Sequence, residues 1–365
     1  MQKRFVNIMK LPDTLLLINP ALRNQTAYHL QSREVPVKLN QNENPFDWPT
    51  SIKEAIGRFC VERPWNRYPP FIPEELKKLL GDYIGVSSDC IIAGNGSNEM
   101  LLVLMLALVT KEQPVILCQP TFTVYHLLAQ SIGSGSITVS LDDGLQFNLA
   151  AIIEASKKSP QSPLIICSPN NPTGSVLDEN DIRTILKQHS GFFILDQAYV
   201  EFGGFSAVAL INEYPNFIVT RTFSKAFAGA GLRIGYMAGN AEVMQHLNKI
   251  KLPYNINFFS EQVARTALQH RNELTEGIKL IIEERAICER FLKTLPLTVY
   301  PSAANFILIR TDRKQALFDA LLADGILVRD VSSYPMLQNC LRISIGSPEE
   351  NRLLQQSMER FFITG

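Results

Sequence analysis

The stretch PLIICSPNNPTGSVLDENDIRTILKQHSGFFILDQA, residues 163–198, decides the fold of this chain. It contains two short apolar runs, LIIC and FFIL, and between them an amphipathic segment that starts with acidic residues, DENDIRTIL. Apolar strands that are bounded by Pro and Gly and alternate with helices are typical of a parallel sheet covered on both faces. The stretch therefore predicts a strand, a helix and a second strand.

The same alternation extends in both directions. CIIAG and PVILCQP precede the stretch, and NFIVTRTF and LRIGYMAG follow it, which predicts a doubly wound α/β sheet. A long helical stretch from about Glu261 to Leu292 then leads to the strand-like runs TVY, NFILIR, GILVRD and CLRISIG. We expect an N-terminal arm over residues 1–44, a large α/β domain over 45–255, and a connecting helix with a smaller α+β domain over 256–365.

Composition excludes several classes of protein. The 365 residues include 35 Lys and Arg and 35 Asp and Glu, so no chain-wide basic field exists for nucleic acid or an anionic membrane. No apolar segment reaches the roughly 18 residues that a membrane helix needs. The six cysteines have no spacing that suggests a disulfide framework or, with the five histidines, a metal site. We expect a soluble cytoplasmic protein with no metal and no nucleic-acid or membrane partner.

Polar groups follow the predicted strands at their carboxyl ends, where open α/β sheets bind ligands. GNGSNE at 94–99 is close to a dinucleotide fingerprint, but Glu99 stands in place of the third glycine. The alternatives are a single-phosphate site at a helix N-terminus, capped by Ser97 or Asn98, and an ordinary cap turn. After LIIC, the amide of Asn171 stands between two prolines, either as a ligand donor or in a simple Asn-Pro turn.

A carboxylate, a phenol and an amine follow the next two strands. Asp196 ends an apolar strand, where a charge is costly unless it is paired, and Tyr199 follows it. Ser224 and Lys225 end NFIVTRTF, and a turn of mostly small residues separates them from Arg233. Lys225 is either a solvated surface lysine or a nucleophilic amine beside exposed backbone. Together these groups match the phosphate, ring nitrogen, phenolate oxygen and aldehyde of pyridoxal phosphate.

Three motifs carry a resemblance to a known family. SPNNPTG, LDQAYVEF and RTFSKAFAGAGLRIGY, in this order, resemble fold-type I pyridoxal-phosphate aminotransferases, and more closely the histidinol-phosphate aminotransferase family. The chain departs from the usual family pattern in DQAY, in GSN and at Gly229, and none of these changes alters a residue that carries chemistry. Further matches, which extend the resemblance to about residues 18–355, are NQNENP at 40–45, RYPP at 67–70, PSAANFILI at 301–309, and LVRD and CLRISIGSPEEN between 327 and 351.

The resemblance implies a role for each matching residue. Lys225 is implied to be the Schiff-base lysine that shuttles the substrate proton, and Asp196 to pair with the pyridine nitrogen. Tyr199 and Asn171 are implied to bond the phenolate oxygen. The other implied cofactor-binding residues are Phe122, stacked on the ring, and Gly96, Ser97, Ser224 and Arg233, around the phosphate.

The resemblance also implies a homodimer with shared active sites, because Tyr68 is expected to reach the phosphate in the neighbouring subunit. The implied substrate-binding residues are Tyr28, Asn44, Arg329 and Arg342. The implied partners are small molecules, an amino donor and a 2-oxo acid acceptor. Two guanidinium groups suit a phosphate ester, so the expected reaction moves the amino group of L-histidinol phosphate to 2-oxoglutarate.

Three alternatives share most of these motifs. They are an aromatic-amino-acid aminotransferase, a threonine-phosphate decarboxylase, and a non-catalytic regulator that binds pyridoxal phosphate. The complete set of chemical groups and the lack of an appended DNA-binding domain oppose the regulator. For Arg329 the alternative role is a surface salt bridge.

Overall fold

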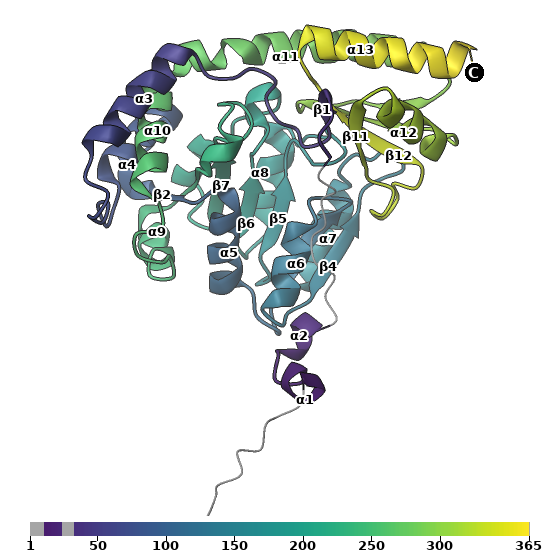
Figure 1. Ribbon diagram of the computed structural model, residues 1–365. Coiled ribbons are helices and arrows are strands. Elements are labelled where there is room, and N and C mark those ends of the chain that lie inside the picture. Colours follow the sequence, from purple (N-terminus) through teal and green to yellow (C-terminus); the bar gives the residue numbers. More distant parts are fainter. Residues whose placement is uncertain (1–10, 24–32, 365) are drawn as a thin grey trace, which may run out of the picture.

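The computed structural model describes residues 11–23 and 33–364. A seven-stranded sheet forms the centre of the larger domain, in the order β2-β8-β7-β6-β5-β3-β4 (Figure 1). All neighbouring strands in it are parallel except β8, which runs antiparallel to both β2 and β7. The strands are β2 (Ile91–Gly94), β3 (Val115–Gln119), β4 (Ser136–Ser140), β5 (Leu164–Cys167), β6 (Phe193–Asp196), β7 (Phe217–Thr222) and β8 (Gly235–Gly239).

The central strands β5, β6 and β7 are buried along their whole length because helices cover both faces of the sheet. A reciprocal capping box between Asp178 and Asp181 starts the helix predicted within DENDIRTIL. The helices of this domain are α3 (Thr50–Glu62), α4 (Glu74–Ile84), α5 (Ser97–Leu108), α6 (Val124–Ser131), α7 (Leu149–Lys158), α8 (Glu179–Gln188) and α9 (Ala241–Leu247). The predicted doubly wound α/β domain is confirmed.

A five-stranded sheet in the order β1-β11-β12-β10-β9 forms the smaller domain. Its strands are β1 (Val37–Leu39), β9 (Thr298–Tyr300), β10 (Phe306–Arg310), β11 (Ile326–Asp330) and β12 (Cys340–Ser344). The connecting helices α10 (Phe258–Gln269) and α11 (Arg271–Leu292) lead into it, and α12 (Lys314–Ala323) and α13 (Pro348–Glu359) pack beside it. Figure 1 shows α11 and α13 running side by side along the top of the molecule.

Three features differ from the sequence prediction. Val37–Leu39 was placed in the arm, but it forms the edge strand β1, which pairs in parallel with β11 of the small sheet. The single helix expected from Glu261 to Leu292 is divided at His270, which ends α10 and precedes α11. The edge strand β4 was missed, because its partly exposed sequence SITVS lacks the continuous apolar run of the buried strands. Apart from β1, the described part of the arm contains only the short helices α1 (Leu11–Leu15) and α2 (Pro20–Arg23).

The arrangement of the two sheets places chemical groups from both domains at one edge. The parallel strands β5, β6 and β7 end on the same side, so the residues that follow them converge there. The chain that leaves β1 crosses to the same edge from the small domain (Figure 1). In the described residues, no helix is long and apolar enough to cross a membrane, and no cluster of His, Cys, Asp and Glu forms a metal site.

Candidate active site

A cavity of about 420 Å³ lies where the two domains meet at the strand ends. It brings together most of the residues predicted from the sequence, and it is also lined by residues 40–43 and by Tyr125 and Tyr334. The predicted residues that line it are Ser97, Phe122, Asn171, Asp196, Tyr199, Ser224, Lys225, Arg233, Arg329 and Arg342. Residues distant in sequence thus form one site with contributions from both domains.

The remaining predicted residues lie elsewhere. Tyr28 falls outside the described residues. Asn44 lines a neighbouring cavity and donates its side-chain amide to the Ala226 carbonyl at 3.2 Å. Tyr68 is 79% exposed and stacks on Tyr254, with ring centroids 4.5 Å apart. Gly96 stands immediately before the first residue of α5, next to Arg233.

One end of the cavity is built to hold an anion. Gly96 caps α5 with φ +79, in place of the predicted side-chain cap from Ser97 or Asn98. A Cβ at Gly96 would meet the Arg233 guanidinium, and one at Gly235 would meet the Ser97 amide. A side chain at either position would therefore displace a group that forms this end of the cavity.

The Arg233 guanidinium and the Ser224 hydroxyl at this end of the cavity are held in place by hydrogen bonds. Arg233 Nη1 donates to Ser224 Oγ at 3.2 Å and to the Ala230 carbonyl at 3.0 Å. Thr222 Oγ1 donates to the same Ser224 Oγ at 2.9 Å. A helix N-terminus, a guanidinium and a hydroxyl that converge in this way fit the phosphate of the predicted cofactor.

Asp196 is a buried carboxylate, 3% exposed, at the end of β6. Its Oδ2 accepts a hydrogen bond from the Tyr125 hydroxyl at 2.6 Å, and its Oδ1 accepts one from the Ala198 amide at 3.1 Å. Burial raises the pKa of Asp196, and the hydrogen bond from Tyr125 opposes this rise. Because both donors are neutral, a cationic ring nitrogen is the partner that would best stabilise the charged carboxylate.

Lys225 follows β7 and extends into the cavity. Its Nζ donates to the Gln41 carbonyl at 2.9 Å and lies 5.9 Å from the centre of the Tyr199 ring. Burial, followed by the positive charge of Arg342, lowers the pKa of Lys225 to about 7. Much of the amine is therefore neutral near pH 7, the form that attacks an aldehyde.

We expect the reaction of Lys225 with pyridoxal phosphate to depend on pH in a way that reports this lowered pKa. The rate at which the cofactor-free protein forms a borohydride-reducible adduct at Lys225 should rise as the pH approaches 7 and level off above it, because the neutral amine then predominates. Rapid mixing, reduction and peptide mapping over a pH series measure this rate. An adduct rate that keeps rising towards about pH 10, as for an ordinary lysine, would contradict the prediction.

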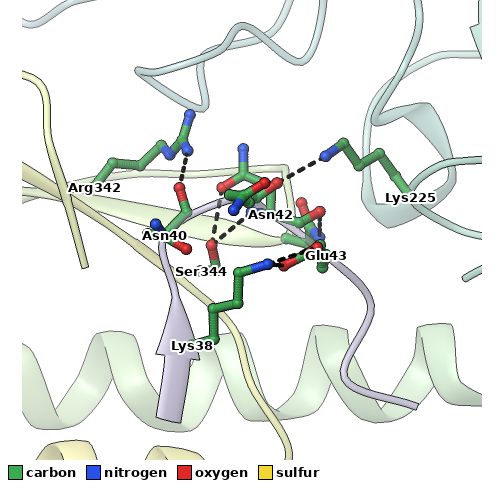
Figure 2. A network of polar contacts seen from close by, with 9 residues as sticks. Lys38, Asn40, Asn42, Glu43, Lys225, Arg342 and Ser344 are labelled. Atoms are coloured by element: carbon green, nitrogen blue, oxygen red, sulfur yellow. Dashed lines mark hydrogen bonds and ion pairs between the residues drawn. The ribbon is translucent and has the colours of Figure 1, made fainter. Parts of the chain in front are cut away.

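Asn171, Tyr199 and Arg342 are joined through the segment that follows β1. Asn42 Nδ2 donates to the Tyr199 hydroxyl at 3.1 Å. Arg342 Nη2 donates to the Asn40 carbonyl at 2.8 Å (Figure 2). Arg342 Nη1 donates to Asn171 Oδ1. Since Asn171 Oδ1 is already used as an acceptor, the amide nitrogen of Asn171 is the group that can donate to a ligand.

Two arginines face each other across neighbouring strands of the small sheet. Arg329 on β11 and Arg342 on β12 are direct register partners. Arg342 is buried, whereas Arg329 is half-buried and, within the described part of the chain, makes neither a hydrogen bond nor an ion pair. The salt bridge considered as the alternative role for Arg329 is therefore absent from this part of the chain. Two adjacent guanidinium groups in one cavity can bind a dianion.

The fold and the cavity define an aminotransferase. Residues 34–357 match the family model of class I and II aminotransferases. Among curated relatives, the histidinol-phosphate aminotransferase of Chlorobium limicola is 38% identical, over 94% of this chain and 98% of that protein. The one from Chlorobaculum tepidum is 37% identical, over 93% of this chain and 99% of that protein. The chain belongs to the histidinol-phosphate aminotransferase family.

Solved structures agree with this placement. The histidinol-phosphate aminotransferase of Clostridium acetobutylicum aligns with a TM-score of 0.82 at 25% identity, over 89% of this chain and 98% of that one. The Sinorhizobium meliloti structure aligns with a TM-score of 0.79 at 26% identity, over 89% and 90% of the two chains, and is a complex with pyridoxal-5'-phosphate. Both the fold-type I prediction and the family resemblance are confirmed.

Sequence reasoning missed three groups that contact the predicted residues. Gln41 holds Lys225 through its carbonyl, Asn42 bonds Tyr199, and Tyr125 bonds Asp196. Gln41 and Asn42 lie in the NQNENP motif, and Tyr125 lies three residues after the predicted ring-stacking Phe122. The motif alone does not show which of its members turn towards the cavity.

Proposed function

We propose that this enzyme transfers the amino group of L-histidinol phosphate to 2-oxoglutarate, giving imidazole acetol phosphate and glutamate, as a step in histidine biosynthesis. The observation that carries this substrate is the pairing of Arg329 and Arg342 on adjacent strands, in the cavity that also contains Lys225. A 2-amino acid needs one guanidinium for its carboxylate, whereas a phosphate ester suits two. The names of the curated relatives support the same substrate.

Pyridoxal phosphate supplies an aldehyde that joins amines covalently and a ring that accepts the electron pair released at the substrate carbon. Lys225 provides the amine that holds the cofactor and that takes and returns the substrate proton, which its lowered pKa permits near neutrality. The charge of Asp196, which is buried at the end of β6, would keep the ring nitrogen protonated. Tyr199 and Asn171 hold the phenolate oxygen, and the anion site around Arg233 holds the phosphate.

Assays of the purified protein with three donors test this proposal. Histidinol phosphate is expected to give the highest catalytic efficiency, with phenylalanine well below it and no carbon dioxide released from threonine phosphate. Faster turnover of phenylalanine would assign the aromatic aminotransferase activity instead. Release of carbon dioxide from threonine phosphate would assign the decarboxylase. A decarboxylase from Porphyromonas gingivalis aligns at 22% identity and shows the shared fold alone.

An exposed apolar surface supports a homodimer. Tyr68 and Phe71 both contact the ring of Tyr254, and Trp65 contacts Phe258, so the loop at 65–71 and the segment at 252–259 form one surface. Trp65 and Leu252 of this surface are 73% and 72% exposed. A contiguous apolar surface of this kind is typical of a subunit interface. We propose that a second copy covers this surface and that Tyr68 then reaches the partner's cavity.

We expect the wild type to sediment at twice the mass of one chain, and the variant Leu252→Asp to shift towards monomer and lose activity. The reason is that a charge buried in an apolar interface is costly unless it is paired. Ile287→Asp is the matched control, because Ile287 is exposed on α11 away from this surface. A wild type that is fully active as a monomer at assay concentration would contradict the shared site.

We also propose that the enzyme is located in the cytoplasm. All six cysteines are free thiols in the structure. Free thiols persist in a reducing compartment such as the cytosol.

A further inference from the structure

Asn42 links the small domain to the phenol that faces the cavity. It is 1% exposed, follows β1, and adopts a left-handed backbone with φ 54. Its backbone amide donates to Ser344 Oγ at 2.8 Å, and its carbonyl accepts from Asn305 Nδ2 at 3.0 Å. Both partners belong to the small domain, so that domain holds the Asn42 backbone in place.

The side-chain amide of Asn42 can be oriented from its hydrogen bonds. Ser344 Oγ accepts the Asn42 backbone N–H, and it donates its own proton to Asn42 Oδ1 at 3.0 Å. Since Oδ1 accepts from Ser344, the nitrogen Nδ2 faces Tyr199 and donates to its hydroxyl at 3.1 Å. The Tyr199 oxygen is thus an acceptor in this bond, and its own proton must point elsewhere.

Tyr199 keeps that proton. The side chain is 5% exposed, and burial raises the pKa of Tyr199 above its ordinary range, although Arg342 and the bond from Asn42 oppose the rise. Tyr199 lines the cavity, so its hydroxyl is a neutral donor available to a ligand there. The direction of this donor depends on the partner on the other side of the oxygen, which is Asn42.

We propose that Asn42 is a positioning residue that makes the Tyr199 hydroxyl a donor to the phenolate oxygen of the cofactor. This inference rests on the proposed function. In Figure 2 the segment after β1 passes between Lys225 and Arg342, and its Gln41 and Asn40 carbonyls bind those two side chains. The orientation of the phenol is therefore determined by the small domain, through Ser344 and Asn42.

The variant Asn42→Asp tests the direction of the hydrogen bond. It is nearly isosteric and keeps an oxygen for Ser344, but it replaces the donor that faces Tyr199 with an acceptor, so the phenol turns its proton away from the cofactor. We expect the affinity for pyridoxal phosphate to fall about 5- to 10-fold. The pH midpoint of the visible absorbance change of the bound cofactor should rise by about one unit, because the phenolate oxygen has lost a donor that favours its charged form.

A double-mutant cycle with Tyr199→Phe separates positioning from a general structural effect. In the Tyr199→Phe background no phenol remains to be oriented. Asn42→Asp should then change the affinity for pyridoxal phosphate less than twofold and shift the pH midpoint by less than about 0.3 units. Equal effects of Asn42→Asp in both backgrounds would overturn the inference and leave the proposed function intact. A wild type that binds no pyridoxal phosphate would overturn the proposed function, and this inference with it.

Discussion

Replacing Lys225 with alanine is expected to abolish amino transfer while cofactor binding stays measurable. The change removes both the amine that bonds the cofactor and the group that moves the substrate proton. Acid–base catalysis alone contributes about 10²–10⁴-fold, so we expect a loss of at least about 10³-fold in kcat. The anion site made by Ser224, Arg233 and the N-terminus of α5 is untouched, and it should still hold the phosphate. Turnover of histidinol phosphate and equilibrium binding of pyridoxal phosphate measure the two effects.

Two controls accompany this variant. Borohydride reduction of the wild type with its cofactor, followed by peptide mapping, should place the label on Lys225. Lys251→Ala is the matched substitution, because Lys251 is also partly buried with a lowered pKa but lies in a different cavity. Its activity should stay close to that of the wild type. A label on another lysine, or full turnover by Lys225→Ala, would refute the assigned chemistry.

Arg329→Ala is expected to lower kcat/KM for histidinol phosphate by about 30- to 150-fold, the equivalent of about 2–3 kcal/mol for one charge-assisted contact. The substrate dianion would then face Arg342 alone. The loss should be much smaller for phenylalanine, whose single carboxylate Arg342 can bind without its neighbour. Steady-state kinetics with both donors give the comparison.

Three further measurements define the role of Arg329. Cofactor affinity should be unchanged, because neither Arg329 nor Arg342 belongs to the anion site around Arg233. Arg329→Lys should lose less than Arg329→Ala, since it keeps the charge and loses the forked geometry. Arg352→Ala is the control, because it removes an exposed ion pair on α13 and should leave kcat/KM unchanged for both donors. If Arg329→Ala lowered kcat/KM equally for both donors, Arg329 would be a structural residue.

The sequence by itself determined the class of fold and the chemistry at the strand ends. Runs such as LIIC and FFIL are apolar enough to identify buried strands, and in a parallel sheet the ends of such strands meet at one edge. Asn171 and Lys225 follow strands and Asp196 ends one, so their convergence could be predicted from the sequence. The local sequence pattern and the sheet topology were sufficient to predict that these residues lie at one edge of the sheet.

Only the tertiary structure decided how these groups are oriented. The partners Asn42 and Ser344 are 302 residues apart in sequence, Arg342 and Asn171 are 171 apart, and Tyr125 and Asp196 are 71 apart. A three-residue strand such as β1 carries too little periodicity to be recognised, and it forms because β11 offers an open edge. A hydrogen bond requires two groups to be within about 3 Å, whereas a sequence pattern reports only neighbours along the chain. The hydrogen bonds of Asn42 with Tyr199 and of Gln41 with Lys225 therefore depend on the packing of one domain against the other.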